Sequence, residues 1–595
     1  MMQLVRAGER AVPYLIQVLS DPQQKQVHDN VITVLRSMRG EAVAPLLVVL
    51  ADAPSASLRM VAFHVVLEER DPRLIPYLWL AEANPNETPV LRREARRALA
   101  SLLHRSVSPT ESQAPLGDWR VELLREAENY YHHRQPLPPG ETVRWWRWEP
   151  GKGLVAQSVS RRDYEVLAGT YWLRKILDIA PDYRPAQVLL TSFLLERAIE
   201  VSGWDKPLSA TSPQLVSTLS VSGGRLLEET LGRALHERKT ATAFAALQVL
   251  AEVRDARLVY SGDPSAPPLI RALSYPDPRV RWQAANTILQ TPLPSAFRGS
   301  SQVVQILARA VTLRDNPRVV LALVDAIQTR QAAERFRALG YEPVTVASGR
   351  AALREVANEH TDLLVLDMRL SDFPLDYHIS LLRQSPEGGY LPIVLWGTEE
   401  SQSEARRLAA RFPFVTLAVP FPMSEAMFQH IVQSAAVPHG PPLSQAQRQA
   451  MRQEALNWLL RIARGELPHY PMAPAYPALL AALQDDTLAP SAAAILAHVR
   501  GRLAQEALAK AMLAAQRPDA VQIAIAQAFY HHVQANTYLL GDEHLQQIRG
   551  LAQKPVPAPV RDIIVRLLQQ LSPSPTATSQ LLQRLPVPTA PPAKP

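Results

Sequence analysis

Residues 361–370, Thr-Asp-Leu-Leu-Val-Leu-Asp-Met-Arg-Leu, decide the fold of one part of this chain of 595 residues. The stretch contains a short apolar run with a β-branched residue, which is typical of a strand buried in a sheet. Similar runs lie before and after it within 317–436, and together they predict a sheet. The predicted strands are Val319–Val324, Pro343–Ala347, Leu363–Leu366, Pro392–Trp396 and Phe414–Val419.

Amphipathic stretches separate these runs, as expected for a parallel sheet that is covered by helices. The predicted helices begin near Gln328, Gly349, Asp376, Ser401 and Ser424. Five strands that alternate with five helices predict a flavodoxin-like (βα)5 domain over 317–437.

The same window resembles the receiver domain of response regulators. The resemblance rests on 336–353 (Phe-Arg-Ala-Leu-Gly-Tyr-Glu-Pro-Val-Thr-Val-Ala-Ser-Gly-Arg-Ala-Ala-Leu), 361–370, 391–395 (Leu-Pro-Ile-Val-Leu) and 419–421 (Val-Pro-Phe). These stretches follow one another in the order that the family has them. The resemblance covers about 120 of the 595 residues and implies a bacterial protein of phosphorelay signal transduction.

The family's reaction transfers a phosphoryl group to an aspartate beside a Mg²⁺ ion that acidic residues hold. The resemblance implies that Asp367 stands at the phosphoacceptor position and Asp325 at the first acidic position. Three further positions depart from the family's pattern. Ala326 stands where the family has its second acidic residue, and Val419 stands where it has a lysine. Gly397 stands where the family has a Thr or Ser, and Thr398 follows one residue later.

The missing lysine has no substitute in the module, because no lysine lies between Lys239 and Lys510. Losing a charge partner removes several kcal/mol of transition-state stabilisation from phosphoryl transfer. We therefore expect a pseudo-receiver that has no catalytic residue and no cofactor. Mg²⁺ at Asp325 and Asp367 is expected only if phosphorylation survives.

Receiver domains bind their partners through the face around the fourth strand, the fourth helix and the fifth strand. The resemblance implies that the corresponding partner face of this chain carries Trp396, Arg406, Arg407 and Phe421.

Outside this window the pattern is helical and repeats. Near the start, Val12-Pro13-Tyr14-Leu15, Ala44-Pro45-Leu46-Leu47 and Ile75-Pro76-Tyr77-Leu78 align, and each precedes an apolar helix, a break and a second helix. Proline suits the first turn of a helix, and an Asp or Asn in the break can cap the second helix. Stretch 268–290, with Asp277-Pro278 at its break, resembles HEAT repeats of the PBS-lyase-like kind, which implies an α-solenoid of stacked helix pairs.

Two smaller features interrupt the repeats. Thr142–Ser160 alternates with aromatic residues around a Gly/Pro-rich turn and predicts a β-hairpin, and Tyr164–Glu200 weakly resembles one tetratricopeptide repeat. The predicted fold class is therefore mainly α, a HEAT-like α-solenoid that a receiver-like domain and a small β-hairpin interrupt. The predicted parts are 1–105 (HEAT-like), 106–210 (linker, hairpin and tetratricopeptide-like helices), 211–316 (HEAT), 317–437 (receiver-like), 438–571 (degenerate HEAT-like) and 572–595 (a disordered tail rich in Pro, Ser and Thr).

Composition excludes several classes of function. The chain has no cysteine, so disulfides and thiolate metal sites are excluded. Its net charge of +7 is spread without a basic cluster, which argues against a nucleic-acid partner. The longest apolar stretches are far too short for a membrane span, and the start lacks a signal peptide, so we expect a cytoplasmic protein.

Two groups of residues could form binding sites, but we favour a structural role for each. Trp145, Trp146 and Trp148 with Arg144 and Arg147 could stack bases or sugar rings, but a hairpin packed onto helices is expected. The pairs 132–133 and 531–532, each His-His, lack the spacing of a helical metal site.

The sequence favours a non-enzymatic scaffold that binds protein partners on the solenoid and on the pseudo-receiver. The alternative is a response regulator that is phosphorylated on Asp367 and uses the helical repeats as its output.

Overall fold

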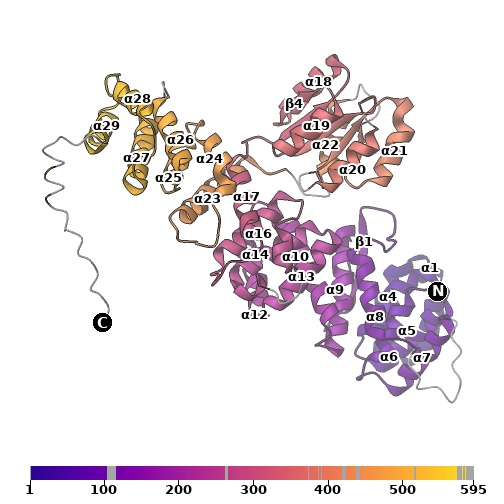
Figure 1. The fold of residues 1–595 in the computed structure, drawn as a ribbon. Helices are drawn as coiled ribbons and strands as arrows, with labels where there is room; N and C mark the ends of the chain where they lie inside the picture. Colours follow the sequence, from indigo (N-terminus) through magenta and orange to yellow (C-terminus); the bar gives the residue numbers. More distant parts are fainter. Residues whose placement is uncertain are drawn as a thin grey trace, which may run out of the picture. The chain divides into compact units, whose positions relative to one another are not determined.

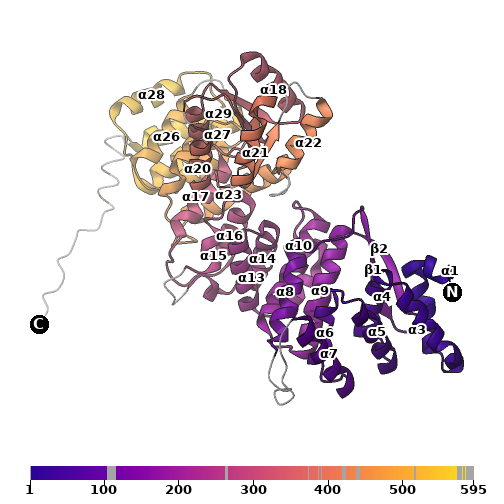
Figure 2. The same cartoon turned by 90° about the vertical axis from the view of Figure 1, so that its right-hand side faces the viewer.

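The computed structural model describes residues 2–103, 116–260, 266–372, 374–385, 388–389, 391–418, 424–436, 442–514, 517–571, 579 and 583. Two compact units emerge: Met1–Gly203 with Arg225–Ala234, and Trp204–Gly224 with Leu235–Pro595. Helices make up most of the described chain, and strands gather in two places (Figures 1 and 2). None of the described helices is long and apolar enough to cross a membrane. The predicted tail, 572–595, falls almost entirely outside the described residues.

The first unit is built mainly from helices that pack against their neighbours in sequence. Helix α2 packs against α3, α4 against α5, α6 against α7, α8 against α9, and α9 against α10. The helices are α1 (Met2–Arg6), α2 (Val12–Ser20), α3 (His28–Ser37), α4 (Gly40–Asp52), α5 (Ala56–Glu68), α6 (Leu74–Ala83), α7 (Pro89–Leu102), α8 (Trp119–Tyr131), α9 (Arg161–Ile179) and α10 (Arg184–Ser202).

The caps of the second helices differ in part from the sequence-based expectation. Asp277 accepts two backbone N–H groups at the start of its helix, as expected. Near the N-terminus, however, Ser55 caps α5 and Thr88 caps α7, whereas Asn84 lies in the turn before α7. The expected Asn cap is wrong because the chain makes a turn after the break, so a later hydroxyl residue reaches the Ncap position.

The predicted hairpin is present as β1 (Thr142–Glu149) and β2 (Gly153–Ser160), which pair antiparallel. Gly151 and Gly153 in its turn have φ of +80° and +77°, a backbone region that favours glycine. The hairpin packs beside α4 and α9, and its label lies next to α4 in Figure 2. This arrangement matches the expectation that the tryptophan-rich strand belongs to a hairpin packed on helices.

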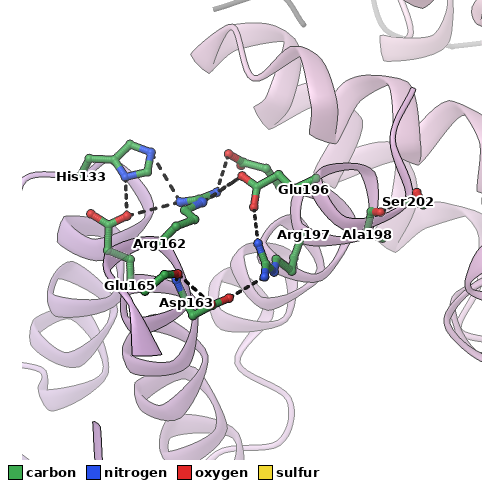
Figure 3. A network of polar contacts seen from close by, with 10 residues as sticks. His133, Arg162, Asp163, Glu165, Glu196, Arg197, Ala198 and Ser202 are labelled. Carbon is green, nitrogen blue, oxygen red and sulfur yellow. Dashed lines mark hydrogen bonds and ion pairs between the residues drawn. The ribbon is translucent and has the colours of Figure 1, made fainter. Parts of the chain in front are cut away.

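A network of charged side chains joins α9 to α10 and to the segment after α8 (Figure 3). Arg162 lies at its centre and contacts Glu165, Glu196 and Glu200, at 3.6, 3.0 and 2.6 Å. His133 Nδ1 lies 2.7 Å from the Glu165 carboxylate. These contacts give His133 a structural role in this unit.

In the second unit, the helix that precedes the sheet domain in the sequence packs against a helix that follows the domain. Helix α17 (Ser300–Val311) precedes the sheet, α23 (Gln445–Ala463) follows it, and the two are in contact. The other helices outside the sheet domain are α11 (Leu208–Thr211), α12 (Pro213–Val221), α13 (Gly224–Glu237, shared with the first unit), α14 (Thr240–Val253), α15 (Pro268–Ala272), α16 (Pro278–Gln290), α24 (Tyr476–Ala482), α25 (Ala489–Leu496), α26 (Arg502–Leu513), α27 (Asp519–Asn536), α28 (Asp542–Ala552) and α29 (Ala558–Leu571). The sheet domain is therefore an insertion in a helical unit.

The inserted sheet is parallel and has the order β4-β3-β5-β6-β7, the order of doubly wound flavodoxin-like sheets. All five strands lie within two residues of their predicted starts. The strands are β3 (Arg318–Ala322), β4 (Glu342–Val346), β5 (Leu363–Asp367), β6 (Ile393–Trp396) and β7 (Val415–Ala418).

Helices cover both faces of this sheet because side chains alternate along each strand. Residues such as Leu321 and Val365 pack on one face with α18 (Ala326–Ala338) and α22 (Glu425–Ala436). The alternate residues, such as Leu364 and Leu366, pack on the other face, where α19 (Gly349–Asn358), α20 (Leu375–Gln384) and α21 (Gln402–Arg411) lie.

Candidate functional site

The candidate site lies where β3, β5 and β6 end at the carboxyl edge of the sheet. The chain reverses its winding direction between β3 and β5, and such a point is where open α/β sheets bind ligands. Asp367 is the last residue of β5, Asp325 lies three residues beyond the end of β3, and Thr398 lies two beyond β6. The sheet thus brings all three sequence-predicted positions to one edge.

Asp367 is fully occupied by hydrogen bonds from its own chain. Arg369 donates its backbone N–H and its Nε to one carboxylate oxygen, at 2.9 and 3.0 Å, and its Nη2 to the other, at 2.9 Å. The backbone N–H of Val324 donates to that second oxygen at 3.1 Å. The Asp367 side chain has an exposed fraction of 0%. The Arg369 guanidinium therefore forms a two-pronged clamp over the phosphoacceptor position.

This clamp fixes the charge of the carboxylate. Burial raises the pKa of Asp367, but the hydrogen bonds from Arg369 and Val324 outweigh it, and the net pKa is lowered. The carboxylate is therefore ionised at neutral pH and paired with the Arg369 guanidinium.

Asp325 serves as a helix cap. Its Oδ1 accepts the backbone N–H groups of Ile327 and Gln328, at 2.8 and 3.0 Å, at the start of α18. These backbone hydrogen bonds lower the pKa of Asp325. Ala326 follows as the first residue of α18 and offers no ligand atom.

Gln328 links the clamp to the sheet. Its Oε1 accepts the indole N–H of Trp396 at 3.2 Å and lies 3.4 Å from Nη2 of Arg369. Trp396 is 2% exposed and packs in the core with α18 and α22. Its expected place on a partner face is therefore wrong, because the last position of β6 points into the core rather than to solvent.

The hydroxyl position of the family is closed by packing. A Cβ atom on Gly397 would overlap Oγ of Ser401 and would lie 3.0 Å from Cγ of Met368. The Thr398 main chain is engaged locally, because its N–H donates to Oγ of Ser401, which in turn donates to the Thr398 carbonyl. The chain therefore has no hydroxyl at 397 and no room for one without rearrangement.

The remaining predicted site residues divide into two groups. Arg406 and Arg407 are exposed on α21, and Arg407 lies 3.6 Å from Glu404. Val419 and Phe421 lie outside the described residues.

Arg369 and Gln328 were missed by the sequence analysis, although the first has a signal. The spacing Asp-x-Arg recurs in the chain, and at three other places the Arg backbone N–H and side chain bind the carboxylate two residues before, whereas Arg184 after Asp182 binds Glu229 instead. These pairs are Asp71 with Arg73, Asp118 with Arg120, and Asp255 with Arg257. Asp367-Met368-Arg369 has the same spacing and forms the same local contact.

The site residues do not fit a Mg²⁺ ion. Magnesium needs several free oxygen ligands in octahedral geometry. Both oxygens of Asp367 are engaged by the clamp, Asp325 caps a helix, and Ala326 replaces the second acid. Nowhere in the described ranges do three or more His, Asp or Glu side chains gather as a metal site.

No family model matches this chain, and no curated protein matches it in sequence. Among solved structures, a match is found to the receiver domain of a sensor histidine kinase from Pseudomonas aeruginosa, at 21% identity and a TM-score of 0.19, over 20% of this chain and 96% of that one. A second match is to a sensor protein from Polaromonas sp., at 21% identity and a TM-score of 0.18, over 20% of this chain and 98% of that one. The fold of the inserted domain is assigned from its own strand order.

Proposed function

We propose that this protein is a non-enzymatic scaffold of a signalling system, in which a receiver-like domain keeps its fold but takes no phosphoryl group. The observation that carries the proposal is the Arg369 clamp on Asp367. A nucleophilic carboxylate must present a free oxygen to the phosphoryl donor, and Asp367 has neither a free oxygen nor an exposed surface.

The clamp also replaces the charges that phosphoryl transfer would use. In the family's reaction Mg²⁺ and a lysine neutralise the developing negative charge. Here Arg369 neutralises Asp367 in the resting state, and opening the clamp would remove the charged partner and its two hydrogen bonds from that carboxylate. The arrangement favours a permanently closed site.

The helical parts are proposed to bind protein partners. Helix pairs that pack against their neighbours in sequence are the building principle of HEAT-type solenoids, which offer extended surfaces. On the inserted domain, Arg406 and Arg407 form an exposed basic pair on α21 that is available to an acidic partner.

Incubation of the purified protein with acetyl phosphate and Mg²⁺, followed by intact-mass measurement, tests the closed site. We expect no mass increase. A stoichiometric increase that is lost in Asp367→Asn would instead support the alternative, a response regulator phosphorylated on Asp367.

A gain-of-function variant tests the cause of the inactivity. Ala326→Asp and Val419→Lys restore the missing acid and lysine, and Arg369→Met removes the clamp. We expect phosphorylation of the triple variant and none of the double variant that keeps Arg369. Arg406→Met in place of Arg369→Met is the matched control, since it removes an exposed guanidinium from the same domain.

A further inference from the structure

A large groove in the first unit is not used by the proposed site. Its volume is about 1390 Å³, and its lining comes from α4, α6, α8, α9 and the hairpin strand β1. A volume above the range of roughly 300–1,000 Å³ that is usual for small-molecule sites indicates an extended ligand.

The groove is lined by aromatic rings that hold one another rigidly. Trp145 contacts Tyr164 and Tyr171 edge to face, with ring centroids 5.5 and 6.3 Å apart. In the same lining, Tyr77 contacts Trp172 edge to face, with ring centroids 4.7 Å apart. Rigid aromatic side chains offer a large contact area at a low cost in conformational entropy.

Four hydrogen-bonding groups beside these rings remain open, and all four can donate. The Tyr77 and Tyr164 hydroxyls and the indole N–H groups of Trp145 and Trp148 have no hydrogen-bond partner among the described residues, and all four side chains are partly exposed. An indole N–H can only donate, and a phenol hydroxyl donates readily.

The two carboxylates that lie among these rings are already engaged. Asp52 receives Lys175 at 2.7 Å and the Tyr171 hydroxyl at 3.2 Å. Glu126 accepts the Gln135 side-chain amide at 2.6 Å. Beside the rings the open side-chain groups therefore favour acceptors on the ligand, while the exposed carboxylates of Glu41 and Asp178 line other parts of the groove.

The charges of the groove cancel. As many acidic as basic side chains line it, and several are paired with one another or with a neighbour outside it. These pairs are Glu9 with Arg144, Asp52 with Lys175, Glu122 with Arg125, Arg147 with Glu149, and Arg73 with Asp71. A strongly charged ligand would gain no net attraction here.

We infer that this groove binds a proline-rich segment of a partner protein in the polyproline II conformation. Such a segment is extended and neutral, its rings stack on aromatic side chains, and its prolines present carbonyl acceptors without any N–H donor. An oligosaccharide also stacks on aromatic rings, but the carboxylates that lie among these rings, Asp52 and Glu126, already accept hydrogen bonds from the chain itself. The inference gives the proposed scaffold a class of partner. Only the word partner rests on the proposed function, because the binding of a proline-rich segment is argued from the groove itself.

Fluorescence anisotropy of a labelled oligoproline peptide, titrated with the full chain, tests the inference. We expect saturable binding, and none of a labelled Ala/Gly peptide of equal length. Tyr77→Phe and Tyr164→Phe each remove only a hydroxyl, so each should weaken binding by about fivefold, the equivalent of one hydrogen bond of roughly 1 kcal/mol.

Tyr14→Phe is the matched control, because Tyr14 belongs to the same unit, is 71% exposed and does not line the groove. Its affinity for the peptide should equal that of the parent chain. The inference is overturned if oligoproline does not bind, if Tyr77→Phe and Tyr164→Phe bind it as the parent does, or if a neutral oligosaccharide binds in its place. Since phosphorylation is measured separately in the inserted domain, failure here leaves the closed-site proposal standing.

Discussion

At the scale of single residues, Asp367 and Arg369 decide what the inserted domain can do. Arg369 lies two residues after Asp367 in the chain, and its guanidinium binds both oxygens of the Asp367 carboxylate. The same local pair occurs at Asp255 and Arg257, where the carboxylate is 22% exposed and the guanidinium 90% exposed. One backbone motif therefore has different consequences at the surface and at a buried strand end.

Asp367→Asn should destabilise the second unit by about 2 kcal/mol, because hydrogen bonds from a charged donor to a buried carboxylate are lost. Urea unfolding monitored by circular dichroism measures this. Asp255→Asn is the matched control and should cost less than about 1 kcal/mol, since exposed ion pairs contribute little. Equal losses for the two variants would contradict the buried clamp.

At the scale of elements, β5 has an acidic residue at each end, and the end opposite the site anchors the inserted domain. Asp362, just before β5, accepts the Arg318 backbone N–H at 2.7 Å and the Arg448 guanidinium of α23 at 2.5 Å. Arg448 is 1% exposed and also donates to the Leu443 carbonyl at 2.9 Å. This buried pair ties the sheet to α23, the first helix that follows the inserted domain.

The anchor should make the second unit sensitive to acid. Burial raises the pKa of Asp362, but the attraction of His360 and Arg448 and the Arg318 N–H outweigh it and hold the pKa at about 2, below the ordinary 3.8. A lowered folded-state pKa stabilises the fold above the unfolded value, and this contribution is lost as pH falls from about 4 through 2.

We expect Asp362→Asn to remove roughly 2 kcal/mol of pH-dependent stability between neutral pH and pH 2. Unfolding free energies measured across this range should fall less steeply for the variant than for the parent. Glu400→Gln, at an exposed position of the same domain, is the control. A parent-like slope in Asp362→Asn would contradict the assignment.

At the scale of the whole molecule, the chain holds two compact units. Multi-domain chains commonly unfold in more than one transition. In the first unit, Arg162 of α9 contacts Glu196 and Glu200 of α10 and Glu165 of its own helix, and the Glu165 and Glu196 side chains are 11% exposed. A substitution that breaks this network should therefore lower the stability of the first unit only.

Arg162→Met should lower the stability of the first unit by about 3 kcal/mol, because partly buried carboxylates lose their partner. Calorimetry should show one transition shifted and the other unchanged. Arg225→Met, whose guanidinium is 89% exposed in the same unit, should leave both transitions in place. A shift of both transitions by Arg162→Met would mean that the units unfold together.

The residue pattern predicts most of the local structure, and the resemblance to receiver domains predicts where the candidate site lies. Apolar runs with β-branched residues placed five strands, because a strand buried on both faces leaves a continuous apolar run. Alternation and a Gly-rich turn placed the hairpin. The resemblance to receiver domains assigned Asp325, Asp367 and Thr398 to the site, and the parallel sheet of the structure brings them to one edge.

How those residues are used depends on the packing of the folded chain. It buries Trp396 in the core and lets Gln328 join Trp396 to Arg369. It also assembles the aromatic groove from Tyr77, Trp145 and Tyr171, which lie far apart in the sequence. The physical reason is that periodicity reports which face of an element is apolar, whereas the contacts of a side chain depend on which elements pack together.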